Sequence, residues 1–295
     1  MFQRRFRSRL RHLATMLYVH TKCSLSERLM RAISGIDPLP GDTVASLIRK
    51  GANVNRPGYS QMPLHSACVE CNADYVELLL RSGACVHSLD VYQRTALHCA
   101  AEKDETCVKI LLEYSADPNA PDGNQDTPLH WAAFKNKVDC VQALLEGGAK
   151  VNARDHNLDT PLSLAAMKGN LESVRSLLEY GALPDTMNRK GYSPAGQLVT
   201  LLGRGLAGER EEECLALLHR ACVKIRFRRE GGLPHDAARV SHLWQRLAKL
   251  MSDPGTLKAL ARRVVRGSLG ECLLSRVVPE LPIPKTIQGY VLLVE

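Results

Sequence analysis

The sequence predicts an all-α solenoid, in which repeated helix pairs stack side by side, and three observations support this fold class. A motif typical of a helix start recurs every 32 or 33 residues. A helical stripe of one valine and two leucines follows each copy of the motif. Each stripe is then followed by a short stop, usually Gly-Ala, which suits the left-handed backbone at a helix end.

The first helix of each pair begins with a motif that is clearest at residues 127–133, Thr-Pro-Leu-His-Trp-Ala-Ala. Thr127 is a good N-cap, and Pro128 suits the first helical position because its missing N–H needs no partner there. Leu129 and the two alanines form the face toward the core, so that another helix can approach closely. We also expect Trp131 to lie in this core. The corresponding leucines of the four copies are Leu64, Leu97, Leu129 and Leu162.

The second helix of each pair carries the apolar stripe at positions i, i+3 and i+4. One stop departs from the pattern, since Ser115-Ala116 places a serine where glycine accepts a left-handed backbone more easily. A first half-unit precedes the four copies, at residues 44–52. The stripes are Val76 with Leu79 and Leu80, Val108 with Leu111 and Leu112, Val141 with Leu144 and Leu145, and Val174 with Leu177 and Leu178.

A turn followed by two helices in about 33 residues is typical of ankyrin repeats, and the chain resembles that family over roughly residues 42–185. We assign ankyrin repeats to residues 42–222, with four clear units between 57 and 185 and degenerate units at the ends. The resemblance implies β-turn fingers between the helix pairs. It also implies a concave face, lined by the fingers and the exposed side of each first helix, that binds another protein.

Carried onto this sequence, that concave face places Phe134 directly after Ala133, where the family usually has a polar residue. Contact with solvent or a partner and partial packing against neighbouring units are both open for this side chain. We expect His98 and His130 to hydrogen-bond neighbouring loops and not to act in catalysis. The candidate substrate-binding residues are Tyr92, Arg94, Asn124, Asp126, Phe134, Lys135, His156, Asn157 and Met167, beside Glu102, Lys103, Asp159 and Lys168.

The N-terminal end of the stack is expected to be covered by residues 24–41, with a helix from Ser24 to Ile36 that starts in a capping box with Glu27. Residues 1–23 hold six basic and no acidic residues. We interpret them as a basic, disordered tail, and a mitochondrial presequence has the same composition.

After residue 185 the repeat pattern decays. We expect a loop at 203–210, an outer helix at 211–221, and a linker at 223–250. The linker contains the basic stretch 224–229, whose alternation favours a short edge strand or a solvated face, followed by a helix from Pro234.

The last segment, residues 251–295, resembles a SOCS box, the module by which cullin-RING ubiquitin ligases recruit substrate receptors. Its first helix has Thr256-Leu257, Ala261 and Val265 four residues apart, and a Leu-Pro-Ile-Pro motif follows. In that family the leucine enters a pocket of elongin C, and the second motif favours cullin five over cullin two. Here Ala261 replaces the usual cysteine, and both are small. The resemblance implies elongin-binding residues Leu257, Leu260, Ala261 and Val265, and cullin-binding residues Leu281, Pro282, Ile283 and Pro284.

From Ser24 onward the order of modules resembles the ankyrin repeat and SOCS box family. This implies a substrate-recognition subunit of an elongin–cullin ubiquitin ligase, without catalytic activity. The implied partners are elongins B and C, cullin five with its RING subunit, and an unidentified protein substrate. The alternative is an ankyrin scaffold whose C-terminal helices only cap the stack.

The composition excludes several other functions. The net charge of +8 lies in the flanks, because residues 24–219 hold 19 basic and 25 acidic residues. The basic stretch 224–229 lacks the pattern of a segment that recognises nucleic-acid bases, so we expect no nucleic-acid partner. No apolar run is long enough to span a bilayer, so no membrane is expected either.

The ten cysteines lie mostly within helical motifs, where they are expected to act as small apolar core residues. Free cysteines of this kind are typical of a reducing compartment, so we expect a cytoplasmic protein. Cys68 and Cys71 form a Cys-x-x-Cys pair near His65, but a zinc site needs a second pair, which is missing at a suitable spacing. We therefore expect neither a metal nor a cofactor.

Overall fold

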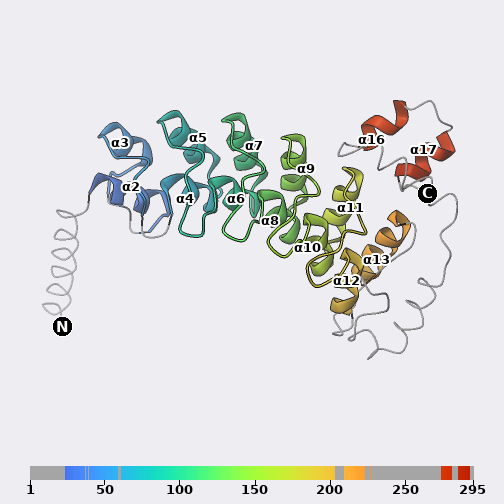
Figure 1. Ribbon diagram of the computed structural model, residues 1–295. Helices are drawn as coiled ribbons and strands as arrows, with labels where there is room; N and C mark the ends of the chain where they lie inside the picture. The colour runs from blue at the N-terminus through green and yellow to red at the C-terminus, as the bar shows by residue number, and fades with distance from the viewer. Residues whose placement is uncertain are drawn as a thin grey trace, which may run out of the picture.

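The computed structural model is an all-α solenoid of stacked helix pairs, as predicted (Figure 1). Each inner helix packs on the inner helix of the next pair, and from α5 onward the outer helices do the same. The structure describes residues 24–36, 38, 40–58, 61–202, 209–222, 227, 274–280 and 285–292.

The described helix pairs each consist of an inner and an outer helix joined by a short connection. The inner helices are α2 (Leu25–Ile33), α4 (Pro63–Val69), α6 (Ala96–Ala101), α8 (Pro128–Phe134), α10 (Pro161–Lys168) and α12 (Pro194–Leu202). The outer helices are α3 (Val44–Arg49), α5 (Ala73–Arg81), α7 (Glu105–Glu113), α9 (Val138–Glu146), α11 (Leu171–Glu179) and α13 (Glu209–Ala221).

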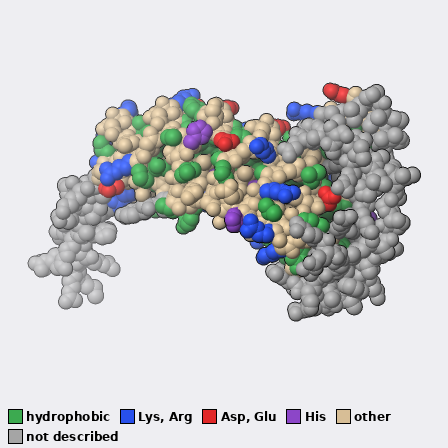
Figure 2. Space-filling model, viewed as in Figure 1, with side chains coloured by type: hydrophobic (Ala, Val, Ile, Leu, Met, Phe, Trp, Pro, Cys, Tyr) green, Lys and Arg blue, Asp and Glu red, His purple; other side chains and the backbone are tan. Residues whose placement is uncertain are grey.

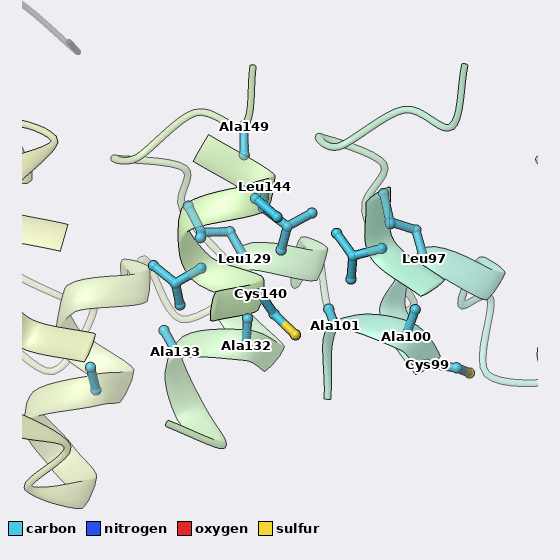
Figure 3. Packing of buried hydrophobic residues seen from close by; sticks show 14 of the residues in the cluster. Leu97, Cys99, Ala100, Ala101, Leu129, Ala132, Ala133, Cys140, Leu144 and Ala149 are labelled. Carbon is cyan, nitrogen blue, oxygen red and sulfur yellow. The ribbon is translucent and has the colours of Figure 1, made fainter. Parts of the chain in front are cut away.

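The core runs without a break along the stack and contains the repeated leucines. Leu64, Leu97, Leu129 and Leu162 are at most 1% exposed, and Ala132 and Ala133 are fully buried. Figure 3 shows why small residues are needed, since Ala100, Ala101 and Ala132 lie where neighbouring inner helices meet. Each unit covers the apolar face of the next one, so no unit is expected to be stable alone.

The outer helices end as the sequence predicts. Gly83, Gly148 and Gly181 have φ angles between +85° and +90°, and Ser115 takes the same left-handed region at +63°. A serine costs more there than a glycine because its Cβ crowds the backbone.

Buried histidines join neighbouring units, as predicted for His98 and His130. His130 Nδ1 accepts from the backbone N–H of Thr127 at 3.1 Å, so the proton is on Nε2, which donates to the Asp159 carbonyl at 3.2 Å. Asp159 belongs to the next turn. His98 binds the Asp126 carbonyl in the same way, at 3.1 Å. Burial lowers the pKa of His130 to about 4, so its neutral form is the one present at pH 7.

Two helix boundaries differ from the prediction. Helix α2 starts in the predicted capping box of Ser24 and Glu27 but ends at Ile33, and Ile36 is 66% exposed. The helix stops earlier because Gly35 takes a left-handed backbone at φ +63°. Helix α13 begins at Glu209, so residues 209 and 210 are helical and not part of a loop.

The predictions for residues 1–23 and most of the linker at 223–250 lie outside the described residues. Phe227 is described, and its side chain is fully buried against the last helix pair. Its carbonyl accepts from the Ser193 N–H at 3.2 Å and lies 1.9 Å from where a Cβ on Gly196 would be. Only glycine at 196 allows the chain to pass this close to α12.

Near the C-terminus, the structure describes α16 (Leu274–Val277), the 3₁₀ helix η2 (Val278–Glu280) and α17 (Lys285–Leu292). Leu274, Val278 and Val291 are buried together and form a small core of their own. Among the described helices, none has both the length and the apolar character to cross a membrane.

The histidine bridges yield a stability prediction. His130→Ala leaves the Thr127 N–H and the Asp159 carbonyl without their partner, so we expect the free energy of unfolding to fall by about 2 kcal/mol. His156→Ala is the matched control because His156 is exposed, and it should change stability by less than about 0.5 kcal/mol. Urea unfolding followed by circular dichroism measures both, and equal stability of the two variants would contradict the role of the bridge.

Candidate protein-binding surface

The turns between the helix pairs are held by carboxylates that bind the backbone of their own turn. Asp122 Oδ1 accepts from the N–H groups of Asn124 and Asp126 at 2.8 and 2.9 Å. These bonds fix the turn because they satisfy N–H groups that the tight backbone leaves free. The corresponding acceptors in the other turns are Asp90, Asp155 and Asn188.

Backbone hydrogen bonds also join each turn to the next one. Gly123 N–H donates to the Tyr92 carbonyl at 3.2 Å, and His156 N–H donates to the Asn124 carbonyl at 3.0 Å. Arg189 N–H continues the series to the Asn157 carbonyl at 2.7 Å. The turn tips therefore form one continuous ribbon, and side chains on it keep a fixed spacing from unit to unit.

At the N-terminal part of this ribbon, Arg94 lies between two aromatic rings. Its guanidinium carbon is 5.1 Å from the centre of the Tyr92 ring and 6.0 Å from that of Trp131. Arg94 Nη2 also pairs with Asp90 Oδ2 at 2.8 Å. Tyr92 itself is 66% exposed, so its ring is available to a partner.

The prediction that Trp131 lies in the core is wrong. Its side chain is half-buried, and its indole N–H donates to Asp122 Oδ2 at 3.0 Å. An indole N–H needs an acceptor, and the buried carboxylate of the turn supplies one. Trp131 thus belongs to the same surface as Tyr92 and Arg94.

For Phe134 both exposure to solvent and packing against neighbouring units were open, and the structure shows some of each. The ring is half-buried and packs between two cations. Lys168 Nζ is 4.5 Å and Lys135 Nζ 5.9 Å from the ring centre. Glu102 lies 3.4 Å from Lys135 Nζ and 3.7 Å from Arg94 Nη1. Ring contacts and ion pairs therefore connect the ends of α6, α8 and α10.

Asp126 is an exception among the turn carboxylates. Its Oδ1 is buried and has no hydrogen-bond partner among the described residues. Burial, together with the nearby charge of Asp122, raises the pKa of Asp126 to about 7. Asp159 is also buried, but it accepts hydrogen bonds from the side-chain amides of Asn188 and Gln197. At neutral pH, Asp126 is therefore only partly ionised.

The nine predicted surface residues all lie in the turns or at the ends of α8 and α10. Asn124, His156 and Asn157 are exposed, and Met167 is 36% exposed. Their role in binding a substrate stays a prediction. We name the described part of this surface the binding face, and it consists of Tyr92, Arg94, Asn124, Asp126, Trp131, Phe134, Lys135, His156, Asn157, Met167 and Lys168.

The two cysteines of the Cys-x-x-Cys pair and the nearby histidine lie in different surroundings. Cys68 is buried in the core, Cys71 is exposed, and His65 Nε2 lies 2.8 Å from the Arg94 carbonyl. Across the part of the chain that the structure describes, no group of three His, Cys, Asp or Glu side chains is placed to hold a metal ion.

All eight predicted elongin- and cullin-binding residues lie outside the described residues. In the sequence the Leu-Pro-Ile-Pro motif at 281–284 falls between η2 and α17, whose Val278 and Val291 pack with Leu274 of α16 in the small C-terminal core. Gln288 Nε2 in α17 donates to the Pro279 carbonyl in η2 at 3.4 Å, so contacts join the two elements on either side of the motif.

Two family models match the chain. The ankyrin-repeat model matches residues 29–122 and 121–188, and the SOCS-box model matches residues 253–292. The chain is therefore an ankyrin-repeat protein with a C-terminal SOCS box, and this combination supports an adaptor role in a ubiquitin ligase.

Relatives that match nearly the whole chain carry the same two modules in their names. The chain is 62% identical to ankyrin repeat and SOCS box protein 8 of Homo sapiens and of Bos taurus over 280 residues, which cover 95% of this chain and 97% of either relative. The Mus musculus protein of that name is 61% identical over the same length. The chain belongs to the ankyrin repeat and SOCS box protein family.

Asp126 gives a prediction for pH dependence. The pKa of Asp126 is about 7 in the folded protein, whereas in the unfolded chain it has its ordinary value of 3.8. The folded state thus holds more protons between these values, so this residue lowers stability as pH rises through that window.

Asp126→Asn removes this effect, so its stability gain over wild type should grow between pH 4 and pH 7 and reach about 1 kcal/mol at pH 8. Urea midpoints at pH 5 and pH 8 measure the difference. Asp139→Asn, at an exposed position of α9, is the control and should keep the wild-type pH dependence. A gain for Asp126→Asn that is independent of pH would contradict the assignment.

Proposed function

We propose that this protein is the substrate receptor of a cullin-RING ligase that contains elongin B, elongin C and cullin five. The binding face holds the target protein, and the SOCS box docks on the elongins and the cullin. The observation that carries the proposal is the coexistence of the SOCS-box match at 253–292 and a stack whose turn ribbon presents exposed aromatic and charged side chains.

The mechanism is positional. The RING subunit brings a ubiquitin-charged enzyme close to the bound target, and this raises the local concentration of ubiquitin at the lysines of the target. In this role the chain needs a rigid face and a docking module but no catalytic group of its own. We also propose that it acts in the cytoplasm, because its buried cysteines serve as small core residues, which suits a reducing compartment.

Within the SOCS box we assign elongin binding to Leu257, Leu260, Ala261 and Val265. Their spacing of i, i+3, i+4 and i+8 is the spacing of anchors on one face of a helix that fills a groove. Ala261 offers less apolar area than the cysteine usual in the family, so the groove contact should be slightly weaker but intact.

The first test concerns this helix. Leu257→Asp places a charge in an apolar groove, and we expect co-purification with elongins B and C to be abolished. Lys258→Asp introduces the same side chain at a position that the sequence pattern assigns to the polar side, and it should retain the elongins. If the Leu257 variant is folded by circular dichroism and still captures both elongins, the assignment is wrong.

The second test separates cullin binding from elongin binding. Leu281→Ala combined with Pro282→Ala removes a large apolar side chain and the restraint that proline places on the φ angle of the motif. Cullin-five capture should therefore fall about tenfold or more. Elongin capture should stay at the wild-type level. Simultaneous loss of both partners would show that the two motifs do not have separate roles.

The alternative function, an ankyrin scaffold without a ligase, makes the opposite prediction for the first test. In that case Leu257 and Val265 are part of the chain's own core, no elongin is captured by the wild type, and Leu257→Asp lowers thermal stability. Measuring elongin capture and the melting temperature of the same variant therefore distinguishes the two functions.

A further inference from the structure

Exposed cations gather on one part of the binding face and in the turn that follows it. Lys135 and Lys168 end the inner helices α8 and α10, and Arg189 and Lys190 lie in the last turn of the ribbon. His156 is exposed in the turn between them. Figure 2 shows Lys and Arg side chains together on the visible face over the region of α10 to α12.

The carboxylates in the same region are buried or already paired, and Glu102 is half-buried between Lys135 and Arg94. Asp155 and Asp159 are 7% and 8% exposed and hold the backbone or amide groups of the turns. Asp126 is half-buried, and its raised pKa keeps part of its population neutral at pH 7. A partner that touches this surface therefore meets mostly positive groups, although residues 24–219 carry a net charge of −6.

The turn at the other end of the ribbon is apolar. Val91 is 63% and Tyr92 66% exposed, and Leu89 beside them is 51% exposed. Side chains of this size are seldom so exposed in adjacent positions unless they contact a partner. Arg94 over the Tyr92 ring separates this apolar turn from the basic region.

We propose that the binding face, together with Val91 and Lys190 in its flanking turns, takes an extended acidic peptide segment that carries a bulky apolar residue toward one end. The apolar residue packs on Val91 and Tyr92, and the acidic residues pair with Lys135, Lys168 and Lys190. The fixed spacing of the turn ribbon suits an extended segment, since each unit presents one group of contacts. The proposal rests on the proposed function, in which the segment belongs to the ligase substrate.

A nucleic acid fits this face less well than an acidic peptide. The cations occupy only one part of the ribbon, and the turn at its other end exposes the apolar side chains of Leu89, Val91 and Tyr92. A peptide can place carboxylates at the lysines and an apolar side chain at that turn, whereas a phosphate backbone is charged at every step and has no counterpart there.

The test uses the full-length chain as bait for a displayed library of random 12-residue peptides. We expect the enriched peptides to contain several Asp or Glu residues and one Trp, Phe or Leu toward an end. The best peptide is then synthesised with a fluorophore, and its affinity is measured by anisotropy. Lys168→Glu combined with Lys190→Glu should weaken binding about tenfold or more, since two attractions become repulsions.

Lys109→Glu combined with Lys150→Glu is the matched control, because both lysines are exposed, one on the outer helix α7 and one after α9. This variant has the same net charge and should bind within about twofold of wild type. Failure to enrich any peptide, enrichment of neutral or basic peptides, or equal loss in both variants overturns the proposal. So does binding of a 20-nucleotide RNA that depends on Lys168 and Lys190 when no acidic peptide is enriched.

A separate measurement of elongin capture distinguishes failure of the peptide proposal from failure of the ligase proposal. We expect the Lys168/Lys190 double variant to capture elongins as the wild type does, because its substitutions are confined to α10 and the last turn. Peptide binding without elongin capture by the wild-type chain refutes the ligase function and leaves the acidic-peptide face intact. Elongin capture without acidic-peptide enrichment refutes the face alone.

Discussion

The stack depends on polar groups that are satisfied across unit boundaries. A turn backbone that reverses direction at the edge of a helical core leaves N–H and C=O groups without helical partners, and unpaired groups there are costly. In this chain a buried histidine of one unit donates to a turn carbonyl of the next, and one turn donates directly to the following turn. Apolar packing alone allows helices to slide, whereas these directional bonds fix the register of each unit.

The same constraint explains which parts of the fold could be predicted. The repeated leucines, the Gly-Ala stops and the capping box of Ser24 each have a local cause, so periodicity and spacing were sufficient. Ile36 misled the helix prediction because it falls in helical register, but Gly35 before it adopts a left-handed backbone. The close passage of Phe227 over Gly196 had no local signal, since it joins residues far apart in the sequence.

The binding face shows a similar division. Position within the repeat was enough to place Tyr92, Phe134 and Lys135 on the surface, because the family assigns those positions to turns and helix ends. Trp131 was misplaced because size and apolarity suggest burial, whereas its N–H requires an acceptor. Only the structure shows that the acceptor is Asp122, in the turn that precedes the same helix. The elongin and cullin assignments still rest on sequence pattern and family resemblance.

Charge is the quantity for which sequence totals and structure differ most. The repeats carry more acidic than basic residues, which by itself suggests a basic partner. In the turns, however, aspartates are placed inward because a carboxylate is the side chain that best accepts two backbone N–H groups at once. Lys135 and Lys168 pack on the Phe134 ring but stay exposed to solvent. A face built from turns stabilised by carboxylates can therefore present positive charge on a negatively charged array, and this is the difference on which the proposed acidic-peptide partner depends.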